Sequence, residues 1–157
     1  MIFGDSGYFI ALWNPNDPHH DEAGVIEQRL RENGWVRGLR DLLTCLPMAW
    51  EVAEGISRAR GVKEGASAYA RVVNNCQVVR PTDRDIQLAF DRTFRLYVGL
   101  SKRVRPPGMI DSIGVTVMRR FKVGRIVSFD RGFDLVPDIR RVQLIGTGST
   151  ARIAGEP

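Results

Sequence analysis

Residues 1–23 read MIFGDSGYFIALWNPNDPHHDEA, and this opening stretch carries the strongest fold signal in the chain. MIF predicts a short buried strand that stops before Asp5, because apolar runs bounded by Asp, Ser and Gly are typical of strands. YFIALW predicts a short helix, and NPND predicts a turn. Asp17 before Pro18 predicts the N-cap of a second helix with proline in its first turn. The opening is therefore a strand followed by two helices.

Beyond this stretch, short strand-like runs continue to alternate with longer helical patterns. The further predicted strands are LLTC (42–45), CQVV (76–79), RIVSF (125–129) and RVQLI (141–145). The predicted helices run up to Asn33-Gly34, from Pro47, over residues 63–74, from Thr82 or Asp83, and from Ile110 up to Gly124. Such alternation predicts an α/β fold with a central, mostly parallel sheet and helices on both faces.

Apolar stripes at helical spacing predict which faces of three helices turn toward the core. The stripes consist of Met48, Val52 and Ile56; of Ile86, Phe90, Phe94 and Tyr97; and of Ile110, Ile113, Val117, Met118 and Phe121. Glu54 stands four residues before Arg58, the order that favours an exposed ion pair on a helix. Cys45 and Cys76 are predicted to be buried, unpaired thiols.

Length and composition predict one globular domain, since the chain has 157 residues, 43% of them hydrophobic and 26% charged. We expect the domain to span residues 1–146, with residues 147–157 as a loose tail rich in Gly, Ser and Thr. The longest apolar run, YFIALW, is far shorter than the roughly 20 residues of a membrane-spanning helix. Two cysteines without CxxC spacing favour a reducing cytoplasm and exclude a cysteine-built zinc site. The residues after Met1 do not predict a secretory signal.

The charge balance favours a polyanionic partner. The chain has 23 Lys and Arg against 18 Asp and Glu, a net charge of +5. If several acids gather in one pocket, the remaining exterior is more basic still, a layout that suits nucleic acid held by its phosphates. Candidate phosphate contacts are Lys102, Arg103 and Arg105 in the loop SKRVRPPG, and Arg131. Basic composition is also common among small proteins, so composition alone leaves the partner open.

Four acids are expected to meet at one edge of the predicted sheet. Asp5 and Asp130 follow the ends of two predicted strands, and Glu51 lies in the helix after LLTC. Asp111 opens the helix after PPG, where the positive end of the helix favours an anion. In open α/β sheets, ligands bind beyond the carboxyl ends of parallel strands. The fold therefore predicts that these four carboxylates face one site.

Clustered carboxylates repel one another unless a cation neutralises them. Ligand sets made only of oxygen select Mg²⁺ or Mn²⁺ rather than zinc, and such ions activate water and stabilise a leaving oxygen. Singly, Asp5 and Asp130 are also typical turn residues, and Asp111 a typical helix-start charge. Their joint placement favours the metal site.

Three stretches resemble PIN-domain proteins, and in particular VapC-like toxin ribonucleases: MIFGDSGYFIALWNPNDPHHDEA, LLTCLPMAWEV and PPGMIDSIGVTVMRRFKVGRIVSFDRGFD. The resemblance extends in the same order to about Ile145 and implies a PIN-like three-layer α/β/α sandwich. It implies that the catalytic and metal-binding residues are Asp5, Glu51, Asp111 and Asp130, with Ser128 as a supporting hydroxyl residue. Gly132 stands where many relatives carry an acid, which leaves one metal ion versus two open.

The resemblance also implies an activity and partners. It implies a Mg²⁺-dependent endoribonuclease that cleaves RNA phosphodiester bonds as the toxin of a type II toxin–antitoxin system, with a homodimeric form and a protein antitoxin. The alternative from another class is a catalytically silent PIN module that serves as an RNA- or protein-binding scaffold. A DNA nuclease of the same fold also stays open. An aspartyl phosphomonoesterase is disfavoured, because that chemistry needs Asp-x-Asp and position 7 is glycine.

Overall fold

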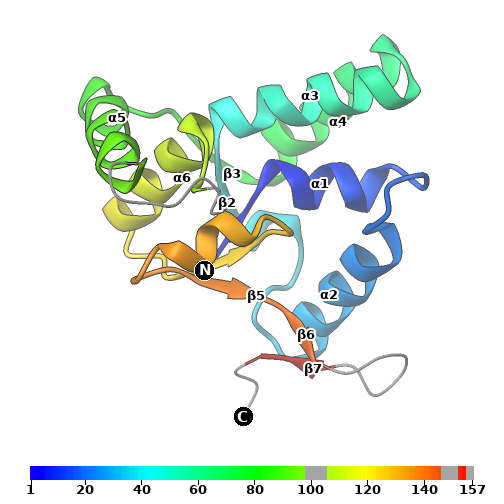
Figure 1. Cartoon of the computed structure of the whole chain (residues 1–157). Coiled ribbons are helices and arrows are strands. Elements are labelled where there is room, and N and C mark those ends of the chain that lie inside the picture. The colour runs from blue at the N-terminus through cyan, green and yellow to red at the C-terminus, as the bar shows by residue number, and fades with distance from the viewer. Residues whose placement is uncertain (98–105, 146–151, 155–157) are drawn as a thin grey trace.

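The computed structural model describes residues 1–97, 106–145 and 152–154, and is built on a five-stranded sheet (Figure 1). The strands are β1 (Ile2–Gly4), β2 (Leu42–Cys45), β3 (Gln77–Val79), β4 (Arg125–Val127) and β5 (Arg140–Val142). They lie in the order β3-β2-β1-β4-β5, and each neighbouring pair is parallel. The first strand of the chain therefore occupies the centre of the sheet.

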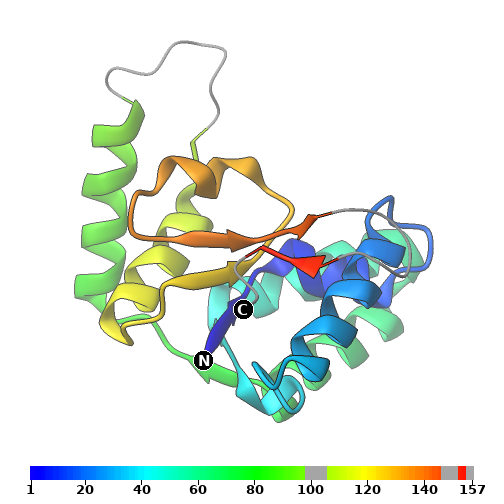
Figure 2. The same ribbon diagram turned by 90° about the horizontal axis from the view of Figure 1, so that it is seen from below.

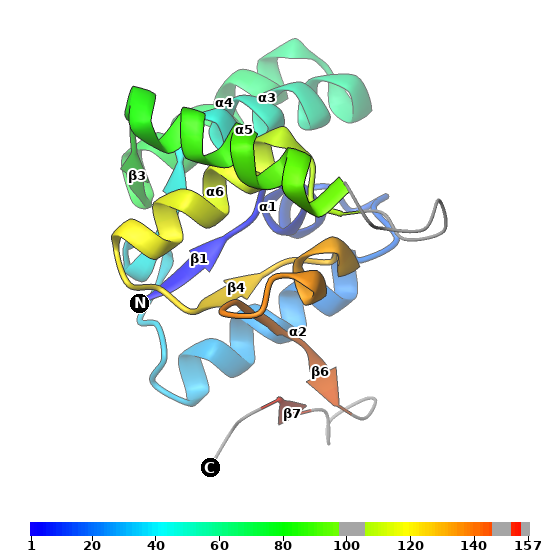
Figure 3. The same cartoon turned by 60° about the vertical axis from the view of Figure 1, so that its left-hand side comes forward.

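Helices cover both faces of this sheet. They are α1 (Ser6–Trp13), α2 (His20–Glu32), α3 (Leu46–Arg60), α4 (Val62–Asn75), α5 (Asp83–Tyr97) and α6 (Met109–Arg120), with short 3-10 helices η1 (Leu39–Asp41) and η2 (Arg131–Leu135). Helices α5 and α6 lie on one side of the strands and α1 and α2 on the other (Figure 2). Helix α5 packs along α6, and α3 and α4 form a hairpin against α1 (Figure 3). The predicted three-layer α/β/α fold is confirmed.

The strands divide their side chains between two hydrophobic clusters. Ile2, Leu42 and Val127 join the cluster formed with α1–α4, whereas Phe3, Leu43 and Ile126 join the cluster formed with α6. This alternation follows from the two-residue period of a strand. Because both faces are covered, both sets are apolar, as is typical of parallel sheets. Strands β1, β2 and β4 are thereby fixed in register, and so are the residues that follow them.

The chain end departs from the predicted single strand RVQLI. Arg140–Val142 forms β5 of the main sheet, whereas β6 (Leu144–Ile145) pairs antiparallel with β7 (Arg152–Ile153). Ile153 is buried in the cluster that includes α2. Most of the predicted tail, residues 147–151 and 155–157, lies outside the described residues. The boundary after residue 146 stays a prediction.

The predicted inward stripe of α5 is wrong at the positions that the structure describes. Ile86 and Phe90 are 45% and 49% exposed; the side chains of Phe94 and Tyr97 lie outside the described part. The buried face instead carries Asp85, Ala89 and Thr93, which are also spaced by four residues. Since small and polar side chains allow close approach, α5 packs on α6 through this face, with Thr93 Oγ1 hydrogen bonded to Ser112.

Two helix boundaries also differ from the prediction. Helix α2 begins at His20, because the Asp17 carboxylate accepts a hydrogen bond from the His19 N–H at 2.9 Å within a turn. Helix α6 ends at Arg120, where Lys122 takes a positive φ of 56°, and Phe121 is 45% exposed.

Two other local expectations hold, and a third, the burial of Cys76, does not. Glu54 and Arg58 form an exposed ion pair. Cys45 is buried and unpaired, and Cys76 is unpaired but only half-buried. Among the residues with described structure, none of the helices combines the length and apolar character that crossing a membrane requires.

The α3–α4 hairpin depends on a glycine at its contact. A Cβ at Gly65 would lie 2.5 Å from the Ala53 carbonyl oxygen. We expect Gly65→Ala to lower the free energy of unfolding by about 1–3 kcal/mol, because the added methyl group forces the helices apart. Gly24→Ala is the matched control: a Cβ at Gly24 meets nothing within 4 Å, so it should stabilise α2 by about 0.5–1 kcal/mol. Urea denaturation measures both, and an unchanged Gly65→Ala protein would contradict this packing.

Candidate functional site

Asp5 occupies the carboxyl end of the central strand and is only 4% exposed. Its backbone N–H donates to the Val127 carbonyl oxygen at 3.1 Å, which continues the pairing of β1 with β4 beyond the strand end. Its side chain accepts a hydrogen bond from Ser128 Oγ at 2.6 Å on Oδ2. A carboxylate is therefore held at a fixed place inside the protein by the residues after two neighbouring strands.

Ser6 connects Asp5 to the helix that follows β2. Ser6 Oγ lies 2.8 Å from Glu51 Oε2 and 3.4 Å from Asp5 Oδ1. Since a hydroxyl group has one proton, the shorter contact marks Glu51 as its main acceptor. Ser6 is not among the residues predicted from the sequence; its one signal there is its position directly after an acid at a strand end.

Asp111 completes a group of three acids that interact electrostatically. It lies in the first turn of α6, and its Oδ2 accepts a hydrogen bond from the Gly108 N–H at 2.9 Å. The negative charge of Asp111 raises the pKa of both Asp5 and Glu51. Residues 5, 51 and 111, far apart in the sequence, thus lie close enough for their charges to interact.

Burial is the main cause of the raised pKa of the Asp5 carboxyl group. Loss of solvent, followed by the charges of Asp111 and Glu51, raises the pKa of Asp5 to about 7, against the lowering effect of the hydrogen bonds from Ser128 and Ser6. Burial also raises the pKa of Glu51, which is half-buried. Among the described residues, neither Asp5 nor Glu51 forms an ion pair. The carboxylates of Asp5 and Glu51 are thus not neutralised by a basic side chain of the described residues.

Asp130 is joined to this group through Ser128 rather than through its own carboxylate. Its backbone N–H donates to Ser128 Oγ at 3.0 Å, while its Oδ1 accepts from the Gly132 N–H at 2.7 Å and caps η2. The side chain of Asp130 is exposed. Within residues 1–97, 106–145 and 152–154, no three His, Cys, Asp or Glu side chains already converge as a set of metal ligands.

The donor chemistry nevertheless fits a hard cation. Mg²⁺ keeps several waters and is commonly held by one or two carboxylates together with substrate phosphates. Asp5 and Glu51 supply such carboxylates at one edge of the sheet, in an environment that disfavours their charge. A divalent cation would remove that penalty, because an opposite charge favours the ionised form.

The surroundings of the acids hold aromatic and basic side chains. The His19 ring stacks on Phe129, between Ser128 and Asp130, with ring centroids 4.3 Å apart and an interplanar angle of 5°. Arg131 is exposed on η2. Lys102, Arg103 and Arg105, the other predicted phosphate contacts, lie outside the described residues.

Comparisons with known proteins identify relatives over nearly the whole chain, although no family model matches it. A VapC ribonuclease of Mycobacterium bovis and ribonuclease VapC13 of Mycobacterium tuberculosis are each 32% identical to it over 146 residues, which cover 90% of this chain and 99% of each relative.

Solved structures show the same fold at lower identity. The structure of VapC20 from Mycobacterium tuberculosis, described as a sarcin–ricin loop cleaving toxin, gives a TM-score of 0.67 at 22% identity and covers 85% of this chain and 93% of that one. The structure of VapBC2 from Rickettsia felis, bound to a promoter DNA fragment, gives a TM-score of 0.61 at 13% identity and covers 90% of this chain and 97% of that one. A toxin–antitoxin complex from Klebsiella pneumoniae gives a TM-score of 0.58 at 12% identity and covers 89% of this chain and 96% of that one. The identity to the two mycobacterial ribonucleases shows that this chain belongs to the VapC ribonuclease family of PIN-domain toxins.

Proposed function

We propose that this protein is a metal-dependent endoribonuclease that acts as the toxin of a type II toxin–antitoxin system. The observation that carries the proposal is the buried Asp5 carboxylate, which lies within electrostatic reach of Glu51 and Asp111 at the carboxyl end of a parallel sheet. This is the edge at which α/β sheets bind ligands. Membership of a ribonuclease family supports RNA as the substrate.

In this proposal Asp5, Glu51, Asp111 and Asp130 hold Mg²⁺, or Mn²⁺ in its place. When bound, the ion supplies Lewis-acid activation of water and stabilisation of the leaving oxygen. The chain's own part is to position the carboxylates: Ser128 fixes Asp5, and Ser6 fixes Glu51. Both serines are positioning residues, since they act on the substrate only through these acids.

The proposed partners follow from charge and from family membership. The positive residues Arg131, Lys102, Arg103 and Arg105 would contact RNA phosphates, which supply most of the affinity in nucleic-acid binding. Neighbours of the same fold occur with their antitoxins in the Rickettsia and Klebsiella structures. We propose a cognate antitoxin and a homodimer for this protein too, and place its action on RNA in the cytoplasm.

Replacement of Asp5 tests the proposed metal site. Asp5→Asn keeps the side-chain shape but removes one charge, so RNA cleavage in Mg²⁺ should fall by at least about 100-fold. Mg²⁺ should raise the Tm of the parent, because a ligand that binds only the native state adds about 2.7 kcal/mol at 100 times its Kd. Asp5→Asn should lose most of that response. RNA gel assays and thermal unfolding measure the two effects.

Asp17→Asn is the matched control, because residue 17 lies in a turn before α2 and its amide oxygen can still accept the hydrogen bond from the His19 N–H. It should keep parental cleavage and the parental Mg²⁺ response. Normal cleavage by Asp5→Asn, with a full Mg²⁺ response, would contradict the site. RNA binding by the parent without cleavage in any divalent metal would favour the silent scaffold instead.

The raised pKa of Asp5 predicts a pH-dependent stability of the metal-free protein. The folded pKa of about 7 exceeds the ordinary value of 3.8, so the folded state holds the proton more tightly than the unfolded state. The contribution of Asp5 to the free energy of unfolding is therefore complete below about pH 4 and is lost as the pH rises from there through about 7. In EDTA, the free energy of unfolding of the parent should fall by about 2–4 kcal/mol relative to that of Asp5→Asn between pH 4 and pH 8.

Urea unfolding in EDTA at a series of pH values measures this difference, and Mg²⁺ should reduce it because the ion binds the ionised carboxylate. Asp17→Asn should follow the parent at every pH. A constant difference between the parent and Asp5→Asn across this range would show that Asp5 ionises normally.

Salt dependence tests the proposed phosphate contacts of the basic loop. Neutralisation of Lys102, Arg103 and Arg105 together by glutamine should reduce the slope of log affinity for single-stranded RNA against log salt by about 2, since each contact contributes roughly 0.7. The Mg²⁺ response of the Tm should be unchanged. An unchanged slope would remove this loop from the RNA path.

A further inference from the structure

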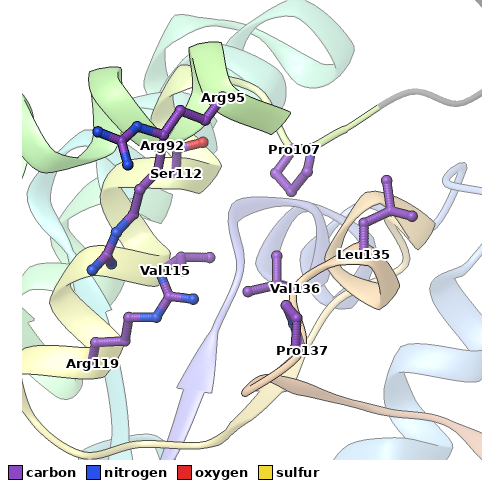
Figure 4. Close-up of a pocket in the computed structure, with 9 residues that line it drawn as sticks. All are labelled: Arg92, Arg95, Pro107, Ser112, Val115, Arg119, Leu135, Val136 and Pro137. Atoms are coloured by element: carbon purple, nitrogen blue, oxygen red, sulfur yellow. The ribbon is translucent and has the colours of Figure 1, made fainter. Parts of the chain in front are cut away.

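A cavity of about 480 Å³ lies between α5, α6 and η2 (Figure 4), and the four acids are not among the residues that line it. One wall is cationic and consists of Arg92 and Arg95 from α5 and Arg119 from α6. The opposite wall is apolar and includes Leu135, Val136 and Pro137. The side chains of Arg92 and Arg119 extend toward each other along the cationic wall (Figure 4). We call this cavity the arginine groove.

We propose that the arginine groove binds a nucleotide of the RNA strand next to the scissile phosphate, with its phosphate on the arginines and its base on the apolar wall. This proposal rests on the proposed function, because it assigns a subsite to the same substrate. It concerns arginines other than the basic residues of the loop 101–108, of which only Pro107 lines the groove among the described residues.

The first support is the positive charge of three arginines that line the groove, only one of which forms an ion pair with a described residue. Arg119 is paired with Asp138, with Nε 2.6 Å from Oδ2. Arg92 and Arg95 form no ion pair within the described part of the chain. Burial and the charge of Arg119 lower the pKa of Arg92, and the negative charge of Asp138 offsets part of this lowering. The guanidinium stays charged at neutral pH. An incoming anion would relieve this repulsion.

The second support is continuity with the acids. Asp130 caps η2, and Leu135 at the other end of η2 lines the groove. Ser112, directly after Asp111, begins the groove on α6, which then runs to Arg119. Seven helical residues extend about 10 Å. An RNA strand that leaves the acids along this side of α6 therefore enters the groove.

The third support is the chemistry of the two walls. Guanidinium groups bind phosphate oxygens through paired hydrogen bonds, and a positive groove that follows the backbone is typical of sites for single-stranded nucleic acid. Here the surface offered to a base is aliphatic, made of Leu135, Val136 and Pro137. The volume of the groove is within the range of about 300–1,000 Å³ found for small-ligand pockets. An acidic peptide would meet the cationic wall, but its carboxylates have no use for the apolar wall opposite.

The test compares RNA binding by charge-matched variants. Arg92→Gln/Arg95→Gln removes two charges from the groove, and Arg40→Gln/Lys63→Gln removes two exposed charges that do not line it. The probe is a fluorescent single-stranded RNA in EDTA, titrated at several salt concentrations. The groove variant should bind on the order of tenfold more weakly at low salt, with a slope lower by about 1.4. The control should stay close to the parent in both.

A second variant keeps every arginine. Leu135→Glu places an anion on the half-buried apolar wall, opposite the guanidinium groups. It should also weaken RNA binding about tenfold, because the new carboxylate competes with phosphate for the arginines. Thermal unfolding should show all variants folded. If one groove variant does not fold, the other decides the outcome.

Cleavage of the same RNA by the parent in Mg²⁺ separates the two proposals. If the parent cleaves and the groove variants bind RNA with parental Kd and slope, the groove proposal is overturned while the proposed function stands. If the parent binds without cleaving and the groove variants lose affinity, the groove is supported and the catalytic role falls. If the parent does not bind RNA, the groove proposal is overturned. The groove proposal would also be overturned if the parent bound an oligoglutamate peptide or free AMP and the groove variants lost that binding while they kept parental RNA binding.

Discussion

The burial of one carboxylate at the end of the central strand is the constraint on which the candidate site depends. Because β1 lies between β2 and β4, the residue that follows it is covered on both sides, and Asp5 is almost fully removed from solvent. An isolated buried charge is costly, so such a group either takes up a proton or acquires a partner. The hydrogen bond from Ser128 offsets only part of that cost, since the pKa of Asp5 is still raised to about 7. The fold thus maintains a position that a cation would stabilise.

The two serines explain how that constraint reaches other elements. Ser128 follows β4 and links Asp5 to the backbone of Asp130, whereas Ser6 opens α1 and links Asp5 to Glu51 on α3. Each hydroxyl group accepts or donates according to its neighbours. The acids are therefore held by a network that crosses three parallel strands, and a shift of β4 or α3 would move a proposed metal ligand directly.

Much of this arrangement could be predicted from the sequence, because the prediction needed only the order of elements. Alternating strands and helices require a parallel sheet, and a parallel sheet brings Asp5, Glu51 and Asp111 to one edge. The electrostatic coupling among these three agrees with that argument. The bridging role of Ser6 could not be predicted, since it depends on a hydrogen-bond distance rather than on a pattern. Likewise, the carboxylate of Asp130 caps η2 in the structure, which its position after a strand does not reveal.

The error in α5 and the arginine groove have one physical origin. A helix in which apolar residues and small residues both recur every four positions has two candidate inner faces, and the partner decides between them. Close approach to α6 selects the face with Ala89 and Thr93. Arg92 and Arg95, which flank Thr93 in the sequence, then lie beside the contact and line the groove. Successive residues on α6 point about 100° apart, so Asp111 interacts with the acids while Ser112 contacts α5 and the groove. Helix α6 thereby presents an anion to the proposed metal, and α5 and α6 together present a basic surface to the proposed RNA. This explains how a basic chain accommodates an acidic site.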